Sequence, residues 1–272
     1  MRLATFNILH GRSPADGRVD LDRLGAAVRG LDADVLGLQE VDRDQPRSHG
    51  ADLTAVAADA MGAPHHRFVA TLAGTPGLWS AATGDLQPRT ASYGIALLSR
   101  WPVLSWHALA LPALRGQVPV VFPGRRRPTL VRDEPRAAVA AVVDAPPGPV
   151  TVVATHLTFI PGWNAVQLRR LVRMVRHLPR PVVVMGDLNL AGTAPARLSG
   201  MRALATAATF PVAAPQRQLD HILADGPVRA LDGRAVDAGL SDHRALVADV
   251  EVEPADAADD DRPVRGRPRA RG

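Results

Sequence analysis

The stretch that decides the fold is Pro181-Val182-Val183-Val184-Met185-Gly186-Asp187-Leu188-Asn189, an apolar run that ends in two polar side chains. Such a run is typical of a buried strand at the point where it reaches a site. Asp187 and Asn189 are two residues apart, so in an extended segment both side chains point to one side. Gly186, directly before them, permits close approach of another backbone. The segment therefore predicts a strand tip that presents a carboxylate and an amide.

Five other short apolar runs end in a polar residue that can hold a metal ion, a phosphate or a proton. They end in Thr5-Phe6-Asn7, Leu38-Gln39-Glu40, Ala154-Thr155-His156, Leu219-Asp220-His221 and Ser241-Asp242-His243. One such ending carries little information. Six endings, spread from residue 7 to residue 243, predict that strand tips from the whole chain converge on one pocket.

Periodicity and breaker residues predict the remaining elements. We expect helices over residues 21–30, 51–61 and 165–178, the first capped by Asp20. We expect strands over residues 33–39, 95–99, 137–143, 150–156, 181–186, 219–223 and 245–252. Pro146-Pro147-Gly148 predicts a hairpin turn. Residues 111–135 show no period and predict a long loop that holds Arg125-Arg126-Arg127.

Length and composition favour a single globular domain. The chain has 272 residues, 46% of them hydrophobic, and contains no cysteine, which excludes disulfides and thiolate metal sites. No apolar run reaches the roughly 18–20 residues that span a bilayer, and no leader pattern precedes the first strand. We expect one domain over residues 1–253 and a disordered charged tail over 254–272. We also expect a cytoplasmic monomer without stable membrane insertion.

The basic balance of the chain does not by itself establish a nucleic-acid partner. The formal net charge is +5 and the sequence pI is about 11.0, values that invite that interpretation. Every basic residue is Arg, however, and an all-Arg set raises the pI without gathering positive charge on one face. Ten aromatic residues (four Trp, one Tyr, five Phe) are spread over the chain, so stacking platforms for bases are few.

The polar strand endings suit a hard divalent cation. Glu40, Asp187, Asn189 and Asp242 offer oxygen ligands, and Asn7 can add an amide oxygen. Oxygen donors with few histidines favour Mg²⁺ or Mn²⁺. The chain has no HExxH and no paired CxxC, which disfavours a zinc site.

Two Asp-His pairs and one arginine complete a hydrolytic set. If strand ends bring Asp220 beside His243, the carboxylate favours the charged imidazole, which can stabilise a pentacovalent phosphorus or exchange a proton with it. Arg136, at the head of a strand, can add positive charge next to the phosphoryl oxygens. These residues predict metal-assisted attack of water on a phosphate ester.

The order of these motifs resembles the endonuclease/exonuclease/phosphatase superfamily. The matching segments are FN, LQE, YGIALLSR, EPR, THL, GDLN, LDH and SDH, which run from residue 3 to residue 252. GDLN and SDH are specific when LQE lies upstream of them. The resemblance implies an α+β fold, a four-layer α/β/β/α sandwich of two stacked mixed β-sheets flanked by helices.

The resemblance also implies roles for individual residues. Glu40 would be the principal Mg²⁺ (or Mn²⁺) ligand, with Asn7 and Asp242 close to the cation. Asp187 would position or deprotonate the attacking water. The phosphate would be held by Asn189 and His156, and the charge of Arg136 would add to their contacts. His243, supported by Asp220, would be the general acid or transition-state stabiliser.

One departure from the family pattern narrows the choice of substrate. Repair nucleases of the superfamily carry an Asp two residues after the first-strand Asn, and Leu9 occupies that place here. This difference favours a phosphodiesterase or phosphatase, acting on a small molecule or a lipid headgroup, over a DNA or RNA nuclease. A catalytically inactive binding module is a third alternative. We expect His221 to be structural, and His10, His49, His65 and His66 to lie in loops.

Overall fold

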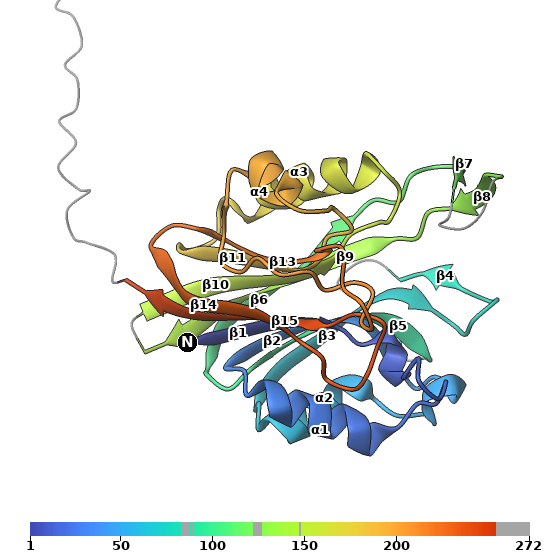
Figure 1. Ribbon diagram of the computed structural model, residues 1–272, viewed down its shortest axis with the longest axis horizontal. Coiled ribbons are helices and arrows are strands. Elements are labelled where there is room, and N and C mark those ends of the chain that lie inside the picture. The colour runs from blue at the N-terminus through green and yellow to red at the C-terminus, as the bar shows by residue number, and fades with distance from the viewer. Residues whose placement is uncertain (83–87, 89, 122–126, 147, 254–272) are drawn as a thin grey trace, which may run out of the picture.

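The computed structural model describes residues 1–82, 88, 90–121, 127–146 and 148–253. Arg125, Arg126 and the tail predicted to be disordered lie outside these residues. Within them, two large mixed β-sheets stack face to face (Figure 1).

The first sheet has seven strands. In spatial order they are β14 (Val228–Val236), β15 (Ala245–Val252), β1 (Arg2–Asn7), β2 (Val35–Arg43), β5 (Ser92–Ser99), β3 (His65–Ala73) and β4 (Ser80–Ala81). β1 and β2 are parallel, and the other neighbours pair antiparallel.

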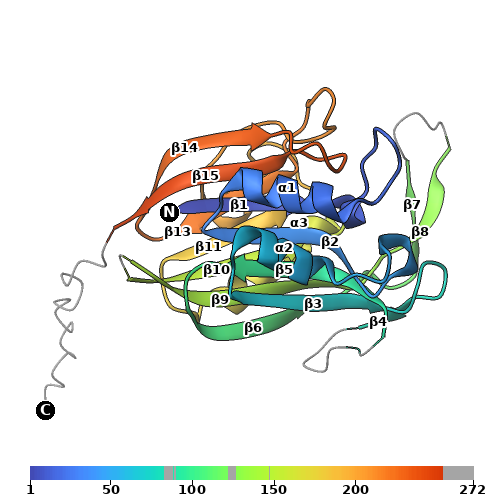
Figure 2. The same ribbon diagram turned by 90° about the horizontal axis from the view of Figure 1, so that it is seen from below.

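The second sheet has six strands. In spatial order they are β12 (Arg202–Ala203), β13 (Asp220–Asp225), β11 (Val182–Asp187), β10 (Gly148–His156), β9 (Arg136–Ala145) and β6 (Val103–Leu111). β10 and β11 are parallel. β7 (Gln117–Val120) and β8 (Thr129–Arg132) form a separate hairpin that projects from one end of the sandwich (Figure 2).

Helices cover the outer face of each sheet. α1 (Leu21–Leu31) and α2 (Leu53–Met61) pack on the first sheet, and α3 (Trp163–Val175) and α4 (Ala194–Ser199) cover the second (Figure 1). Short 3₁₀ turns follow β1 at Leu9–Gly11 and β2 at Pro46–Ser48. The predicted four-layer α/β/β/α sandwich is confirmed.

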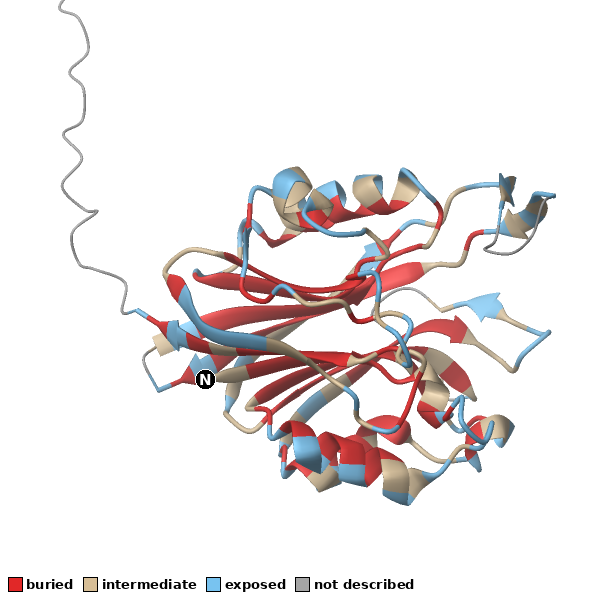
Figure 3. Ribbon diagram, viewed as in Figure 1, coloured by how far each residue is buried: buried red, intermediate tan, exposed pale blue. Residues whose placement is uncertain are grey.

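Burial follows these layers. The apolar residues between the sheets form one cluster, to which β9 and β10 contribute alternate residues such as Val139, Ala141, Val152 and Ala154. Two further clusters fill the spaces between each sheet and its own helices. Figure 3 shows the central strands of both sheets buried and exposed residues on the outward faces of the helices. Because both faces of the central strands are covered, these strands appear in the sequence as continuous apolar runs.

The helix boundaries follow from their caps. Asp20 accepts a hydrogen bond from the backbone N of Arg23 at 3.0 Å, as predicted for the start of α1. Asp52 caps α2 in the same way, so this helix begins at Leu53 rather than at residue 51. Gly62 ends α2 in the left-handed conformation that glycine adopts readily. Among the described residues, no helix is long and apolar enough to cross a bilayer.

Several elements differ from the prediction. The loop expected over residues 111–135 contains the β7–β8 hairpin. β3, β6 and β14 were not predicted, and His65 and His66 therefore lie in a strand rather than in a loop. β14 is mostly exposed at a sheet edge, and β6 lies at the edge of the second sheet, so neither carries a long apolar run. β3 begins with polar residues and becomes fully buried only from Phe68.

The register of the second sheet places three polar side chains in a row. His156 at the end of β10 pairs with Asp187 at the end of β11. Asp187 in turn pairs with Asp220 at the start of antiparallel β13. In the first sheet, Asn7 at the end of β1 pairs with Gln39, next to Glu40. Polar strand tips from both sheets therefore meet at one end of the sandwich.

Candidate active site

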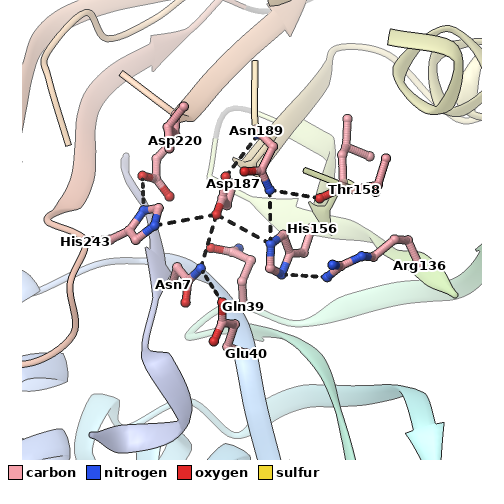
Figure 4. A network of polar contacts seen from close by, with 12 residues as sticks. Asn7, Gln39, Glu40, Arg136, His156, Thr158, Asp187, Asn189, Asp220 and His243 are labelled. Atoms are coloured by element: carbon pink, nitrogen blue, oxygen red, sulfur yellow. Dashed lines mark hydrogen bonds and ion pairs between the residues drawn. The ribbon is translucent and has the colours of Figure 1, made fainter. Parts of the chain in front are cut away.

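Asp187 lies at the centre of the polar cluster (Figure 4). Its Oδ2 atom accepts a hydrogen bond from Nδ2 of Asn7 at 3.1 Å. The same Oδ2 atom lies 3.5 Å from Nε2 of His156 and 3.8 Å from Nε2 of His243. Only 2% of Asp187 is exposed. One carboxylate thus joins side chains from β1, β10 and the segment before β15.

Gly186 allows this arrangement because β10 and β11 approach closely beside it. Its φ of +150° is a conformation that residues with a side chain rarely adopt. A Cβ atom at this position would lie 1.9 Å from the backbone O of Thr155. The close backbone approach predicted for this glycine is confirmed.

Asp220 and His243 form a buried pair. Nδ1 of His243 lies 2.8 Å from Oδ2 of Asp220. The ring of Phe210 packs on the imidazole, with ring centroids 4.9 Å apart. These contacts fix the plane of the imidazole and direct its Nε2 atom toward Asp187 (Figure 4).

The pKa values of His243 and of the neighbouring Asp187 are both shifted from their usual range. Burial lowers the pKa of His243, but the charge and hydrogen bond of Asp220 outweigh it and raise this pKa to about 10. His243 is therefore a cation at neutral pH. Burial, followed by the charge of Asp220, raises the pKa of Asp187 to about 7, against the opposing charge of His243. Asp187 can therefore exchange a proton near neutral pH.

His156 differs from His243 because its neighbour is a cation. Nη1 of Arg136 lies 3.2 Å from Nδ1 of His156, so the guanidinium donates and the imidazole accepts. Burial and then the charge of Arg136 lower the pKa of His156 well below its usual range. His156 is neutral, with its proton on Nε2, which faces Asp187. Nε of Arg136 is buried and has no hydrogen-bond partner among the described residues.

Glu40 lies at an irregularity of β2. The pairing of β2 with β5 shifts between Gln39 and Val41, and Glu40 has a φ of +57°. Left-handed conformations of residues other than glycine are strained and cluster at functional sites. The irregularity turns the carboxylate of Glu40 into the cluster, where its Oε1 atom accepts from Nδ2 of Asn7 at 3.0 Å.

Two carboxylates, those of Glu40 and Asp187, flank the Asn7 amide, and the charge of a third, Asp242, acts on Glu40. Burial raises the pKa of Glu40, and the nearby charge of Asp242 raises it further. Oδ1 of Asn7 accepts from the backbone N of Leu9 at 3.1 Å, so the amide nitrogen rather than the oxygen faces Glu40 and Asp187. The oxygen donors of Glu40, Asp187 and Asp242 fit a hard divalent cation.

Backbone contacts hold the segments that carry these groups. Oγ of Ser241 donates to the backbone O of Asn7 at 2.6 Å, which places Asp242 and His243 beside the end of β1. The backbone N of Asn189 donates to Oδ1 of Asp187 at 3.0 Å, and its Nδ2 atom donates to the backbone O of Leu157 at 3.0 Å. Ser241 and Asn189 both have positive φ, as Glu40 does.

All of the residues predicted for the site therefore lie at one end of the sandwich. His221 points elsewhere, with Nε2 2.8 Å from the backbone O of Leu190. Neighbouring residues of a strand face opposite ways, which explains why Asp220 enters the cluster and His221 does not.

Sequence reasoning missed two supporting residues. Phe210 packs on His243 from a segment with no recognisable motif. Oδ1 of Asp133 accepts from Oγ1 of Thr158 at 2.5 Å, and its Oδ2 atom accepts from the backbone N of Leu114 at 2.7 Å. The buried Asp133 thus ties two loops beside His156. The one available signal was its position directly before the EPR segment, inside the predicted loop.

Comparison with known proteins agrees with this architecture. The sequence profile described as the Endonuclease/Exonuclease/phosphatase family matches residues 4–243. An endonuclease/exonuclease/phosphatase of Beutenbergia cavernae is similar in structure, with a TM-score of 0.66 and 26% identity over 93% of this chain and 72% of its own. No curated protein matches the sequence significantly.

Two more distant structures share the fold. A mannosyl-6-phosphatase of Bacteroides thetaiotaomicron has a TM-score of 0.59 and 14% identity over 92% of this chain and 99% of its own. Beta toxin of Staphylococcus aureus has a TM-score of 0.58 and 15% identity over 92% and 99%. The profile match covers most of the sequence, including every polar strand tip described above. The chain belongs to the endonuclease/exonuclease/phosphatase family.

Proposed function

We propose that this chain is a Mg²⁺- or Mn²⁺-dependent hydrolase that cleaves a phosphate ester by direct attack of water on phosphorus. Membership of the family supports phosphoester hydrolysis in general. One observation carries the proposal for this site: Asp187 lies within 3.1–3.8 Å of Asn7, His156 and His243, although these residues come from three distant parts of the sequence.

Glu40 and Asp242 are the proposed ligands of the cation. Asp187, Asp220 and His243 also form a compact acid-histidine group, with ligand atoms within 4.8 Å of one another. Nδ1 of His243 is engaged with Asp220, however, and the imidazole is protonated, so it has no free lone pair for a metal. The oxygen donors around Glu40 are therefore the better site. A cation bound there supplies Lewis-acid polarisation of the phosphoryl oxygens.

Asn7 is assigned a bridging part in this site. Its amide nitrogen donates to both Glu40 and Asp187, and its oxygen is engaged with the backbone of Leu9. Asn7 therefore holds two carboxylates at a fixed separation, and it becomes a ligand itself only if the amide turns over.

Asp187 and His243 divide the proton chemistry between them. Asp187, with a pKa near neutrality, orients the attacking water and accepts its proton. His243 remains cationic next to Asp220 and donates to the leaving oxygen or to the phosphoryl oxygens. No covalent intermediate with the protein is required by this arrangement.

Arg136, His156 and Asn189 are proposed to hold the phosphate. Arg136 presents the free N–H of its Nε atom, and His156 presents Nε2–H toward Asp187. Asn189 is held beside the cluster by hydrogen bonds from its backbone N to Asp187 and from its side-chain Nδ2 to the backbone O of Leu157. Cationic and neutral donors at fixed positions stabilise charge that develops on phosphoryl oxygens.

A phosphatase or phosphodiesterase acting on a small molecule is the branch that we favour. A pocket of about 550 Å³ lies beside the site, between residues 72–81, 113–116 and 132–135. Its wall includes Trp79 and Glu134, and Glu134 pairs with Arg136 at 3.4 Å. A concave pocket of this size suits a small organic substrate. The structural neighbour from Bacteroides thetaiotaomicron is named as a mannosyl-6-phosphatase.

A nuclease is the second candidate, and exposed arginines near the site favour it. Arg12 and Arg18 have side chains without a hydrogen-bonded partner among the described residues, as phosphate-contacting residues do before they bind. Cleavage of DNA by such an enzyme should weaken steeply with salt, whereas cleavage of a phosphomonoester should not.

Turnover of a broad panel of phosphate mono- and diesters, with Mg²⁺, with Mn²⁺ and with a chelator, tests the proposal. We expect cation-dependent release of phosphate or alcohol from at least one ester, and loss of this activity in His243→Ala. Cation-dependent thermal stabilisation without turnover on any ester would instead favour an inactive binding module.

A further inference from the structure

We propose that a basic hollow beside the catalytic centre binds a second phosphate group of the same substrate molecule. The inference rests on the proposed function and adds a substrate class, namely esters that carry two phosphate groups. The basic hollow is the concave surface formed by His10, Arg12, Arg18, Arg47 and His49.

The hollow is large, and the charged side chains that line it are all basic. Its volume is about 770 Å³, and the described residues that line it include three arginines and two histidines but no acid. Arg12 and Arg18 are exposed, and neither guanidinium has a hydrogen bond or ion pair with the described residues. The neighbouring Asp16 forms its ion pair with Arg23, at 2.7 Å, although the charge of Arg18 also acts on this carboxylate. A concave surface with two guanidiniums free of any hydrogen bond or ion pair among the described residues, those of Arg12 and Arg18, is suited to a phosphate.

The electrostatic potential inside the hollow is positive. Burial, followed by the charges of Arg47 and Arg12, lowers the pKa of His10 to about 4. His10 is therefore a neutral imidazole that can donate or accept a hydrogen bond, surrounded by cationic groups. An anion that enters the hollow meets these charges without having to displace a carboxylate.

Arg47 is already fixed in position. Its Nε atom donates to Oδ2 of the buried Asp42 at 2.8 Å, and its Nη2 atom donates to Oδ1 at 2.7 Å. Its Nη1 atom has no such partner among the residues that the structure describes. Since the side chain is held by Asp42, little conformational entropy is lost when Arg47 binds a ligand.

Arg47 also connects the hollow to the catalytic centre. Its guanidinium carbon lies 5.5 Å from the ring centroid of Tyr93. Burial lowers the pKa of Arg47, but Asp42, Tyr93 and Glu40 together raise it, which places Arg47 within electrostatic reach of the proposed cation ligand Glu40. The loop that follows β1 carries His10 and Arg12, which line the hollow. This loop lies at the same end of the sandwich as the tip of β1 (Figure 1).

The two walls of the hollow are joined. Nε2 of His49 lies 3.2 Å from the backbone O of Val19, so the segments before α1 and α2 contact one another. Leu9 and His10 both have left-handed φ values, which turn the chain from β1 into the hollow. The hollow therefore exists before a ligand arrives, which reduces the cost of binding.

Binding of inorganic phosphate, measured by calorimetry in the presence of a chelator, tests the hollow without relying on catalysis. The chelator removes the attraction that a cation at the catalytic centre would add, and the loss of binding in the variant described next assigns the bound phosphate to the hollow. We expect wild type to bind phosphate and the Arg12→Ala/Arg18→Ala double variant to bind it at least about tenfold more weakly. Arg169→Ala/Arg170→Ala on α3 removes the same charge from the opposite side and should bind as wild type does.

Kinetics then identify the source of the second phosphate. One pair of substrates is a hexose monophosphate and the corresponding bisphosphate; the other is a thymidine dinucleotide with one phosphate and its trinucleotide homologue with two. In the Arg12→Ala/Arg18→Ala variant we expect the KM of the two-phosphate member of one pair to rise at least about tenfold more than that of its partner. Whichever pair responds identifies a small bisphosphate or an oligonucleotide.

The outcomes separate the two proposals. If wild type binds no phosphate in the chelator, or if the double variant binds it as tightly as wild type does, the basic hollow is not a phosphate site. If the KM values of both members change equally in each pair that is cleaved, the hollow does not hold a second phosphate of the substrate. If phosphate binds in the hollow but no ester is hydrolysed with any cation, the proposed function fails and the hollow remains a phosphate site.

Discussion

Nδ1 of His243 lies 2.8 Å from Oδ2 of Asp220, and both side chains are buried at the end of the sandwich. Asp220 begins a strand of the second sheet, and His243 precedes a strand of the first. The pair therefore joins the two sheets at the site. A histidine in this position is held as a cation by the fold rather than by the substrate.

The charge of this pair should be visible in the pH dependence of stability. Burial lowers the pKa of His243, but Asp220 raises it to about 10, above the value near 6.5 of an unfolded histidine. The resulting stabilisation is fully present below pH 6.5 and is lost as the pH rises toward 10. We expect the free energy of unfolding of wild type to fall over this range more than that of Asp220→Asn. Urea denaturation from pH 6 to pH 10 measures this free energy. If it fell equally with pH in both proteins, Asp220 would not stabilise the cationic form of His243.

The close contact of β10 and β11 predicts a large effect of one methyl group. Gly186→Ala places a Cβ 1.9 Å from the backbone O of Thr155, at a φ of +150°. We expect a loss of at least about 3 kcal/mol in the free energy of unfolding, or failure to fold. A Cβ added at Gly30 in α1 meets no atom within 4 Å. Gly30→Ala should therefore raise the free energy of unfolding by up to about 1 kcal/mol. Chemical denaturation of both variants measures whether their free energies of unfolding change in opposite directions. A small loss of stability in Gly186→Ala would be evidence against the close contact of β10 and β11.

Glu40 should control the affinity for the cation. Glu40→Gln keeps the hydrogen bond to Asn7 but removes a charged oxygen donor. We expect the concentration of Mg²⁺ that gives half-maximal rate to rise at least about tenfold. A titration of initial rate against Mg²⁺ measures it. Glu251→Gln, on the exposed side of β15, is the control and should titrate as wild type does.

Arg136 should act through its fork of donors and not through its charge alone. It donates to His156 at 3.2 Å, pairs with Glu134 and presents a free Nε. Lysine retains the charge but cannot make these contacts together. We therefore expect kcat/KM of Arg136→Lys to fall at least about tenfold, while Arg169→Lys leaves it unchanged. Equal values for Arg136→Lys and wild type would remove Arg136 from the phosphate site.

The sequence predicted the buried strands and the polar strand ends that the fold brings together. Runs such as Val182–Asp187 are apolar because both of their faces are covered, so each run and its polar end are visible without coordinates. The order of the polar tips identified the family, and the family resemblance implied the layers. The roles of Asp20 and Gly186 could be predicted because a helix cap and a close backbone contact each require a particular residue type.

Other features depend on contacts that the sequence does not encode locally. β14 and β6 lie at sheet edges, where only part of each strand is buried and no continuous apolar run is needed. Phe210 reaches His243 from a segment without regular structure. The orientation of the Asn7 amide follows from the two carboxylates beside it, which are 33 and 180 residues away in the chain.

The central claim is that the cluster around Asp187 hydrolyses phosphate esters. The most direct measurement is the initial rate with Mg²⁺ on p-nitrophenyl phosphate and bis(p-nitrophenyl) phosphate for wild type and Asp187→Asn, with the exposed Asp144→Asn as the matched control. We predict that Asp187→Asn lowers kcat by a factor of at least about 100 on any ester that wild type cleaves, while Asp144→Asn remains at the wild-type rate. A folded Asp187→Asn protein with kcat within a few fold of wild type would contradict the account.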